Sequence, residues 1–161
     1  MISVSQHLTP MQASQLRTTI TQLDEAYWRD RSRHKPNVGM DGKPGQYHSC
    51  GRVACPESLR QQVDNLAPDY PGLMLEDWII NWTKPGGGLP PHIDNEGYLG
   101  IAVLCLQSGS GAFVWYQNND LKQAKCIEDK AGKLIQFNDI TQIHAVPPAL
   151  TNRYVIVFLY R

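Results

Sequence analysis

Three side chains in the second half of the sequence have the residue types and spacing of a metal site. His92 and Asp94 stand two residues apart, and His144 follows much later in the chain. On an extended strand, residues two apart point to the same face, so His92 and Asp94 can reach one ion while Ile93 points away into apolar packing. A later strand that returns to this place brings His144 to the same ion. The pattern therefore predicts a metal centre made of His92, Asp94 and His144, and we interpret these three as the catalytic residues.

The ligand set indicates which metal and which chemistry. Two imidazoles and one carboxylate on one face of an ion form the arrangement associated with non-haem Fe(II) oxygenases, and they leave three coordination positions free. A 2-oxo acid can chelate the ion through two of these positions, and O2 takes the last one. The three free positions are thus what an oxygenase of this kind requires.

Arg153 supplies a second indication. If residues 147–152 connect two strands, Arg153 opens the antiparallel neighbour of the strand of His144 and projects into the same barrel mouth. An arginine inside a barrel is costly unless an anion pairs with it, and its planar guanidinium suits a carboxylate. Arg153 therefore predicts an acidic co-substrate close to the metal, and the far carboxylate of 2-oxoglutarate meets this requirement.

Two stretches of the sequence resemble a known family. The segment from His144 through Arg153-Tyr154-Val155-Ile156 to Tyr160 looks like the C-terminal motif of the prolyl-hydroxylase-like branch of the Fe(II)/2-oxoglutarate-dependent dioxygenases. The glycine-containing stretch from Lys84 to Asp94 resembles the lead into the first two metal ligands of that family. The resemblance covers about residues 78–161. It implies a double-stranded β-helix, a jelly roll of the cupin-like kind, with Fe(II) at the three ligands, 2-oxoglutarate at Arg153, O2 as co-substrate and ascorbate as reductant.

The sequence also departs from that family. Prolyl hydroxylases of this branch place tyrosines on the strand before the first histidine and on the strand after the aspartate, where they help to hold 2-oxoglutarate. The nearest positions here are Trp82 and Cys105, and an apolar residue, Val157, replaces a polar group that follows the arginine. We therefore predict a rebuilt co-substrate pocket in which Trp82, Cys105 and Tyr98, a residue just past the second ligand, join Arg153.

The elements that must position these residues follow from hydrophobic periodicity. Thr9-Pro10 predicts the start of a helix over roughly 10–28, a second helix begins at Pro56 and ends before Pro68, and 37–45 forms a loop or hairpin tip around Asp41-Gly42. Short apolar runs from residue 73 onward predict seven strands, near 74–83, 89–94, 98–106, 112–117, 133–137, 142–146 and 153–160. The sequence thus predicts one domain, 1–161, of the α+β class but mainly β. Residues 1–72 form its helical support and loops and 73–161 its β-helix core.

Charge and composition limit the partners and the location. Fifteen basic and fifteen acidic residues give a net charge of zero, which gives no global electrostatic argument for a nucleic acid or an anionic membrane. No apolar run is long enough to span a membrane, and the N-terminus lacks the pattern of a signal peptide. The four cysteines are too few for a disulfide scaffold. These features predict a cytoplasmic protein; they say nothing of its oligomeric state.

The leading functional prediction is a dioxygenase that hydroxylates a C–H bond of a prolyl or other peptidyl residue, releasing succinate and CO2, with a protein or peptide as partner. The alternative in the same superfamily is an oxygenase or demethylase for nucleic-acid bases, which the basic segment Arg29–Lys35 and Asn81 favour and the zero net charge opposes. A third reading is a jelly-roll module that binds a metal without catalysis. His48, Cys50 and Cys55 resemble part of a zinc cluster but lack a fourth ligand nearby, so ordinary packing is favoured.

Overall fold

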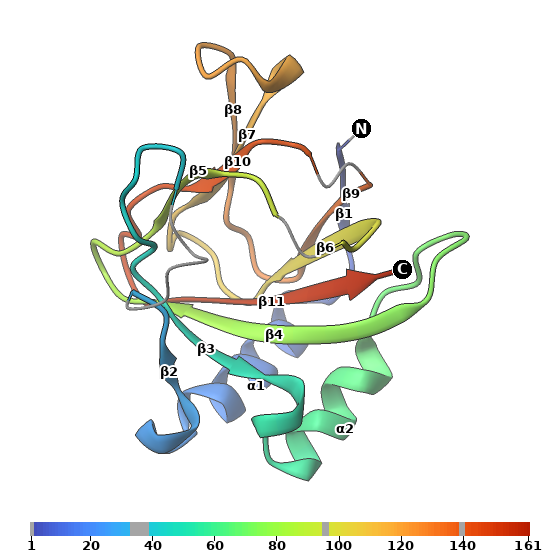
Figure 1. Cartoon of the computed structure of the whole chain (residues 1–161). Coiled ribbons are helices and arrows are strands. Elements are labelled where there is room, and N and C mark those ends of the chain that lie inside the picture. The colour runs from blue at the N-terminus through green and yellow to red at the C-terminus, as the bar shows by residue number, and fades with distance from the viewer. Residues whose placement is uncertain (1, 33–38, 95–96, 139–140) are drawn as a thin grey trace.

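The computed structural model describes residues 2–32, 39–94, 97–138 and 141–161 (Figure 1). Within them, two α-helices and eleven strands follow one another along the chain. The helices are α1 (Pro10–Thr21) and α2 (Glu57–Leu66), and short 3-10 turns lie at η1 (Glu25–Tyr27), η3 (Arg52–Ala54) and η4 (Gln117–Asn119). The strands are β1 (Ile2–Gln6), β2 (Arg29–Asp30), β3 (His48–Gly51), β4 (Leu75–Thr83), β5 (Leu89–His92), β6 (Gly100–Cys105), β7 (Ala112–Tyr116), β8 (Ala124–Glu128), β9 (Lys133–Phe137), β10 (His144–Val146) and β11 (Arg153–Tyr160).

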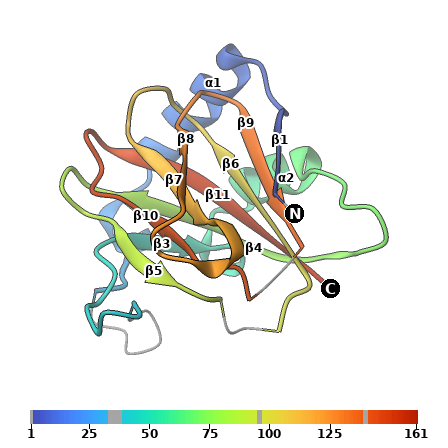
Figure 2. The same ribbon diagram turned by 90° about the horizontal axis from the view of Figure 1, so that it is seen from above.

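The strands form two antiparallel sheets that face each other (Figures 1 and 2). The larger sheet has the order β1-β9-β6-β11-β4-β3-β2, and the smaller one has the order β5-β10-β7-β8. The strands from β4 to β11 divide evenly between the sheets, and the chain crosses repeatedly from one sheet to the other. This winding is that of a double-stranded β-helix, so the fold predicted from the sequence is confirmed.

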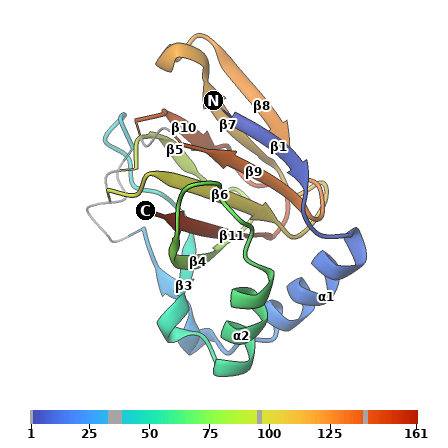
Figure 3. The same ribbon diagram turned by 90° about the vertical axis from the view of Figure 1, so that its right-hand side faces the viewer.

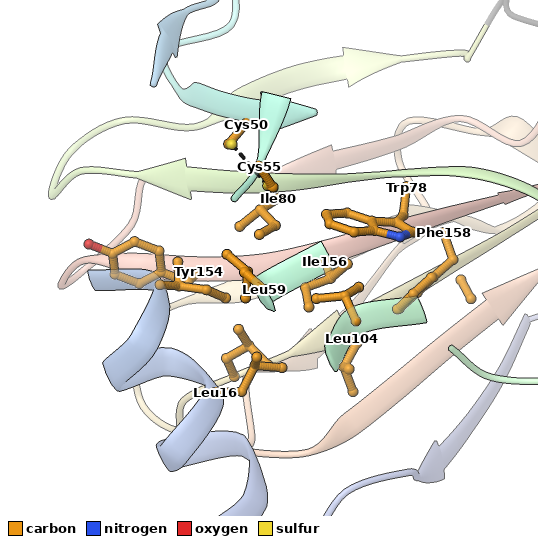
Figure 4. Packing of buried hydrophobic residues seen from close by; sticks show 14 of the residues in the cluster. Leu16, Cys50, Cys55, Leu59, Trp78, Ile80, Leu104, Tyr154, Ile156 and Phe158 are labelled. Atoms are coloured by element: carbon orange, nitrogen blue, oxygen red, sulfur yellow. Dashed lines mark hydrogen bonds between the residues drawn. The ribbon is translucent and has the colours of Figure 1, made fainter. Parts of the chain in front are cut away.

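Both helices pack on the outer face of the larger sheet, as Figure 3 shows. Because side chains alternate along a strand, one set of residues on β4 and β11 points to the helices and the other set points between the sheets. Figure 4 shows the helix-facing set. Its fully buried members include Trp78, Ile80, Ile156 and Phe158, and they meet Leu16, Ile20, Leu59 and Val63 of the helices. The helices therefore cover one sheet from outside, as the sequence predicts.

The first helix begins where the sequence predicts and ends earlier. The Thr9 hydroxyl accepts a hydrogen bond from the Gln12 backbone N–H at 3.1 Å, and the Gln12 side chain accepts one from the Thr9 N–H at 2.9 Å, which is a capping box. The helix ends at Thr21 rather than near residue 28. Asp24 accepts a hydrogen bond from the Ala26 N–H and caps the turn η1, so this polar side chain starts a new turn instead of continuing the helix.

The N-terminal region also contributes three strands that the sequence does not predict. Strands β1, β2 and β3 join the larger sheet, and β8 adds an edge to the smaller one. Both β1 and β8 are mostly exposed, and β2 has only two residues, so none of them carries the apolar run on which the prediction depends. The loop predicted over 37–45 forms a tight turn at Gly42, which has a φ of 77°. Residues 37 and 38 lie outside the described part of the chain.

Among the described residues, no helix is long and apolar enough to cross a bilayer.

Replacing Phe158 with alanine tests the packing between the larger sheet and the helices. Phe158 is fully buried, so we expect the loss of the ring to lower the free energy of unfolding by about 3–5 kcal/mol. The matched control is Leu150→Ala, at a side chain that is 73% exposed, where a change below about 0.5 kcal/mol is expected. Urea denaturation measures both. Equal effects of the two substitutions would show that this face is not the main core.

Candidate metal centre

Strand pairing brings the two histidines of the predicted centre together. Strand β10 lies between β5 and β7, and His144 on β10 stands directly opposite His92 on β5. Strand β5 carries Pro90 and Pro91, and proline is tolerated there because β5 is the edge of the smaller sheet. Gly88 precedes this strand, and a Cβ at Gly88 would collide with the backbone carbonyl of Val146. The glycine therefore allows β5 to approach β10 closely enough to pair.

The three predicted ligands meet at one point. The rings of His92 and His144 have centroids 4.2 Å apart, and the Asp94 carboxylate lies beside both. One Asp94 oxygen is 3.5 Å from Nε2 of His92, and the other is 3.1 Å from Nε2 of His144. One candidate ligand atom from each residue lies within 4.8 Å of the others. Their burial differs, since His144 is buried and the other two are partly exposed. The structure thus brings together the three residues that the sequence singled out.

Backbone carbonyls orient both imidazole rings in the same way. Nδ1 of His92 lies 2.9 Å from the carbonyl oxygen of Pro90, and Nδ1 of His144 lies 2.9 Å from that of Gln142. A carbonyl only accepts hydrogen bonds, so Nδ1 carries the proton in each neutral ring. The lone pair is then on Nε2, the atom that faces the shared point. This is how proteins prepare histidine for metal binding, because the bond at the second nitrogen fixes both the tautomer and the ring direction.

The pKa shifts agree with a centre that holds charge. Burial alone would raise the pKa of Asp94, but interactions with the neighbouring imidazoles of His144 and His92 outweigh it and hold that pKa well below the usual range. Burial favours the neutral form of His144, yet the neighbouring Asp94 carboxylate raises the pKa of this ring. An ionised carboxylate facing two Nε2 atoms is a donor set suited to a divalent cation, and the residues present therefore fit Fe(II).

A cavity of about 150 Å³ between the two sheets opens onto the three residues. Its walls are largely apolar, with Val103, Phe113, Phe137, Val155 and Val157 among the residues that line it. The Phe113 ring stacks against His144 with centroids 5.5 Å apart. Small-molecule sites have this character, with an apolar lining and a few polar groups that fix the orientation of the ligand.

Arg153 lines the same cavity but already has an anionic partner. Its Nε and Nη2 donate to the two carboxylate oxygens of Asp129 at 2.7 and 3.1 Å. The Ser110 hydroxyl donates to the same carboxylate at 2.7 Å. Arg153 is 3% exposed and Asp129 is 5% exposed. The arginine is thus inside the barrel, as predicted, yet its charge is balanced within the protein. Burial of Arg153 therefore does not by itself require an anionic ligand.

Trp82 and Cys105, two predicted co-substrate contacts, are not among the residues that line the cavity. The Trp82 ring stacks on Tyr154 on the helix side of the larger sheet, and its Nε1 donates to the Asn152 side chain at 3.0 Å. The Cys105 thiol is buried and donates to the carbonyl oxygen of Gln107. Neither residue lines the cavity. Trp82 lies outside the cavity because side chains alternate across the sheet, so its neighbour Thr83 is the residue that points inward.

Tyr98 does line the cavity, and the guanidinium of Arg161 lies 4.7 Å from the centre of its ring. Its contact with a co-substrate remains a prediction.

Several cavity residues were not predicted as ligand contacts. Thr83 stands opposite Arg153, and Asn81 stands opposite Ser49, all four facing the cavity. Tyr47, in the loop before β3, also lines the cavity. The alternation of β4 could have identified Thr83 and Asn81, because their helix-facing neighbours are aromatic or aliphatic. Ser49 and Tyr47 gave no such signal, because β3 is short and follows an irregular loop.

The basic segment and the cysteine pair also have clear positions. Arg29 and Asp30 form the edge strand β2 rather than a helix end, and Arg31 lines the cavity. Residues 33–35 of that segment lie outside the described part of the chain. The thiols of Cys50 and Cys55 lie 3.0 Å apart in the core beneath the helices (Figure 4). His48 packs against Trp82 instead.

No protein-family model matches the chain. One curated protein, described as uncharacterized protein L905 of Acanthamoeba polyphaga mimivirus, is 32% identical over 74 residues. The match covers 44% of this chain and only 35% of that protein, so the matched part spans about a third of the relative's length.

Solved structures resemble the whole chain. A prolyl-4-hydroxylase from Pseudomonas putida is 18% identical, with a TM-score of 0.67 over 99% of this chain and 91% of that one. A Trichoplax adhaerens prolyl hydroxylase, solved with a peptide fragment of hypoxia inducible factor, is 14% identical, with a TM-score of 0.64 over 99% and 82%. HygX from Streptomyces hygroscopicus, solved with nickel and 2-oxoglutarate, is 12% identical, with a TM-score of 0.67 over 99% and 82%. The chain has the double-stranded β-helix fold of 2-oxoglutarate- and Fe(II)-dependent oxygenases.

Alkylation of the thiols tests the position of Cys105. Burial and the nearby Asp129 carboxylate raise the pKa of Cys105 to about 11, so about one thiol in a thousand is ionised at pH 8. Cys126 is the exposed cysteine, while Cys50, Cys55 and Cys105 are buried. We expect iodoacetamide at pH 8 to add one group per native chain, measured by intact mass, and four after denaturation. A Cys126→Ser control should stay unlabelled when native. Fast labelling of Cys105 would show that its thiol opens to the cavity.

Proposed function

We propose that this chain is an Fe(II)- and 2-oxoglutarate-dependent dioxygenase that hydroxylates a C–H bond. The observation that carries the proposal is the meeting of His92, Asp94 and His144, with both Nε2 atoms facing the carboxylate at the wall of a largely apolar cavity. The fold shared with oxygenases of this kind supports it, and so does HygX, which was solved with nickel and 2-oxoglutarate bound.

The three side chains would hold Fe(II) as a facial set and leave the remaining positions to the co-substrates. When bound, Fe(II) with 2-oxoglutarate and O2 supplies the oxidising power for hydroxylation, with release of succinate and CO2. Asp94 contributes the negative charge that the cation needs, and the carbonyls of Pro90 and Gln142 keep the imidazoles in the ligating tautomer. The apolar walls exclude water from the reacting atoms. Ascorbate is the expected reductant.

The far end of 2-oxoglutarate would lie at the inner part of the cavity. Arg153 offers donors that Asp129 does not use, since the described hydrogen bonds engage its Nε and Nη2 but not its Nη1. Thr83, the partner of Arg153 on the adjacent strand, is buried and lines the same cavity. We assign the co-substrate carboxylate to Arg153 and Thr83, with Tyr98 nearer the outer end.

The substrate proposed is a prolyl or other peptidyl residue. Two of the similar structures are prolyl hydroxylases, and one of them was solved with a peptide. Arg31 at the cavity favours a second candidate, an oxygenase for nucleic-acid bases, because an arginine there suits a phosphate backbone. Peptide libraries and single-stranded oligonucleotides, each offered at low and high salt, separate the two. Hydroxylated peptide supports the first, whereas oxidised base that disappears at high salt or in Arg31→Gln supports the second.

Metal binding should depend on the three side chains. We expect calorimetry with Mn2+, an inert replacement for Fe(II), to show one metal site per chain. His144→Ala or Asp94→Asn should weaken metal binding about 100-fold or more, because removing a metal ligand lowers the affinity more than removing a residue that only hydrogen-bonds to a ligand. The matched control is His7→Gln, since His7 bonds the Leu66 carbonyl far from the cavity. Unchanged binding in the His144 and Asp94 variants would contradict the assignment.

Turnover tests the chemistry directly. With Fe(II), ascorbate and O2, we expect the wild-type chain to convert 2-oxoglutarate to succinate and His92→Ala to abolish this conversion, as measured by mass spectrometry. Trp82→Phe is the control inside the fold, and we expect it to retain activity because Trp82 faces the helices. A chain that binds the metal but never consumes 2-oxoglutarate, with or without candidate substrates, would instead be a non-catalytic metal-binding module.

A further inference from the structure

The buried pair of Arg153 and Asp129 changes what the inner end of the cavity can recognise. Asp129 follows β8, a strand at the edge of the smaller sheet, and it approaches Arg153 from outside the cavity, since Arg153 lines the cavity and Asp129 does not. The pair is bidentate and nearly free of solvent, and the Ser110 hydroxyl holds the carboxylate in place. This carboxylate is therefore a fixed partner of Arg153 outside the cavity lining.

A guanidinium has five N–H donors, and Asp129 uses two of them. The others remain available for hydrogen bonds, but the positive charge is already matched by one negative charge at close contact. A ligand at Nη1 thus meets hydrogen-bond donors that carry little net charge. A ligand carboxylate there gains less binding free energy than it would from an unpaired buried arginine, and it comes close to the Asp129 carboxylate.

The other polar groups near this end are neutral. Ser49, Asn81 and Thr83 face the cavity from β3 and β4, and each offers a hydroxyl or an amide. Arg31 also lines the cavity, and it follows β2, a strand that β3 and β4 separate from the strand of Arg153 at about 5 Å per strand. The inner wall therefore presents hydrogen-bonding groups without the excess positive charge that would select a second carboxylate.

We infer that Asp129 determines co-substrate specificity: by neutralising Arg153, it lets the pocket accept 2-oxo acids that lack a second carboxylate alongside 2-oxoglutarate. This inference rests on the proposed function, because it concerns the co-substrate of the same site. Asp129 acts through Arg153 and is a positioning residue in that sense. Its effect is on selectivity, which a purely structural role would not change.

The test compares two ligands that differ in the second carboxylate. Calorimetry on the Mn2+-loaded chain measures the Kd of 2-oxoglutarate and that of 2-oxovalerate, which has the same chain length without the second carboxylate. We expect the wild-type protein to prefer 2-oxoglutarate by about thirtyfold or less, the effect of one or two ordinary hydrogen bonds. Asp129→Asn keeps the shape and an acceptor for Arg153 but removes the charge, and we expect it to raise this preference by about tenfold or more.

The matched control is Ser110→Ala. It removes the hydroxyl that donates to Asp129 but leaves the ion pair intact, so the preference should stay within about twofold of wild type. A second readout is thermal stability. Asp129→Asn leaves a buried charge without its partner, so 2-oxoglutarate should raise the Tm of this variant more than that of the wild type, whereas 2-oxovalerate should not.

Three results would overturn the inference. A wild-type preference for 2-oxoglutarate above about a hundredfold would leave the proposed function standing and reject the role of Asp129, and it can be measured even if the variant does not fold. An Asp129→Asn variant that loses 2-oxoglutarate affinity would show that Asp129 only orients Arg153. If the preference for 2-oxoglutarate over 2-oxovalerate is abolished by Arg31→Gln and unchanged in Asp129→Asn, the second carboxylate of 2-oxoglutarate binds at Arg31. Binding of neither ligand to the metal-loaded wild-type chain rejects the proposed function itself.

Discussion

The candidate site depends on one strand register, the pairing of β5 with β10 that places His92 opposite His144. A shift by one residue would turn every side chain of β5 to the other face, and the two Nε2 atoms would no longer share a point. Pairing is possible because Gly88 lets the backbone of this segment approach Val146. The same register lets each histidine bond a carbonyl two residues earlier in its own chain segment, at Pro90 and at Gln142. Local backbone geometry therefore fixes both the position and the tautomer of the proposed ligands.

The cavity has two charged regions that are built differently. At the metal centre, the Asp94 carboxylate faces the Nε2 atoms of His92 and His144, a donor set that a cation would complete. At the inner end, Arg153 and Asp129 complete each other, and no ion is needed for neutrality. Apolar residues such as Val103 and Val155 line the same cavity and weaken solvent screening inside it. A ligand spanning the cavity is thus fixed by charge at one end and by hydrogen bonds at the other.

Sequence patterns predicted the residues whose signal is local. The spacing of His92 and Asp94 has the period of a strand, and the position of Arg153 after a Pro-containing connection indicates an inward side chain. The choice of Trp82 failed because comparison by position does not decide which face a residue takes, and Thr83, one residue later, is the partner of Arg153. Asp129 could not be predicted at all. It follows a mostly exposed edge strand without an apolar run, and its contact with Arg153 is purely tertiary.

The edge strand β8 and its partner β7 position Asp129. Asp129 reaches Arg153 because its own N–H donates to the Gly111 carbonyl and because Ser110, just before β7, donates to its carboxylate. The ion pair thus depends on the β7–β8 hairpin, and β7 also pairs with β10, the strand that carries His144. Asp129 itself follows the outer strand β8, which has no pairing with β5 or β10. A change of the Asp129 side chain can therefore alter the charge beside Arg153 while the pairing of β7, β10 and β5 that positions the proposed ligands stays the same.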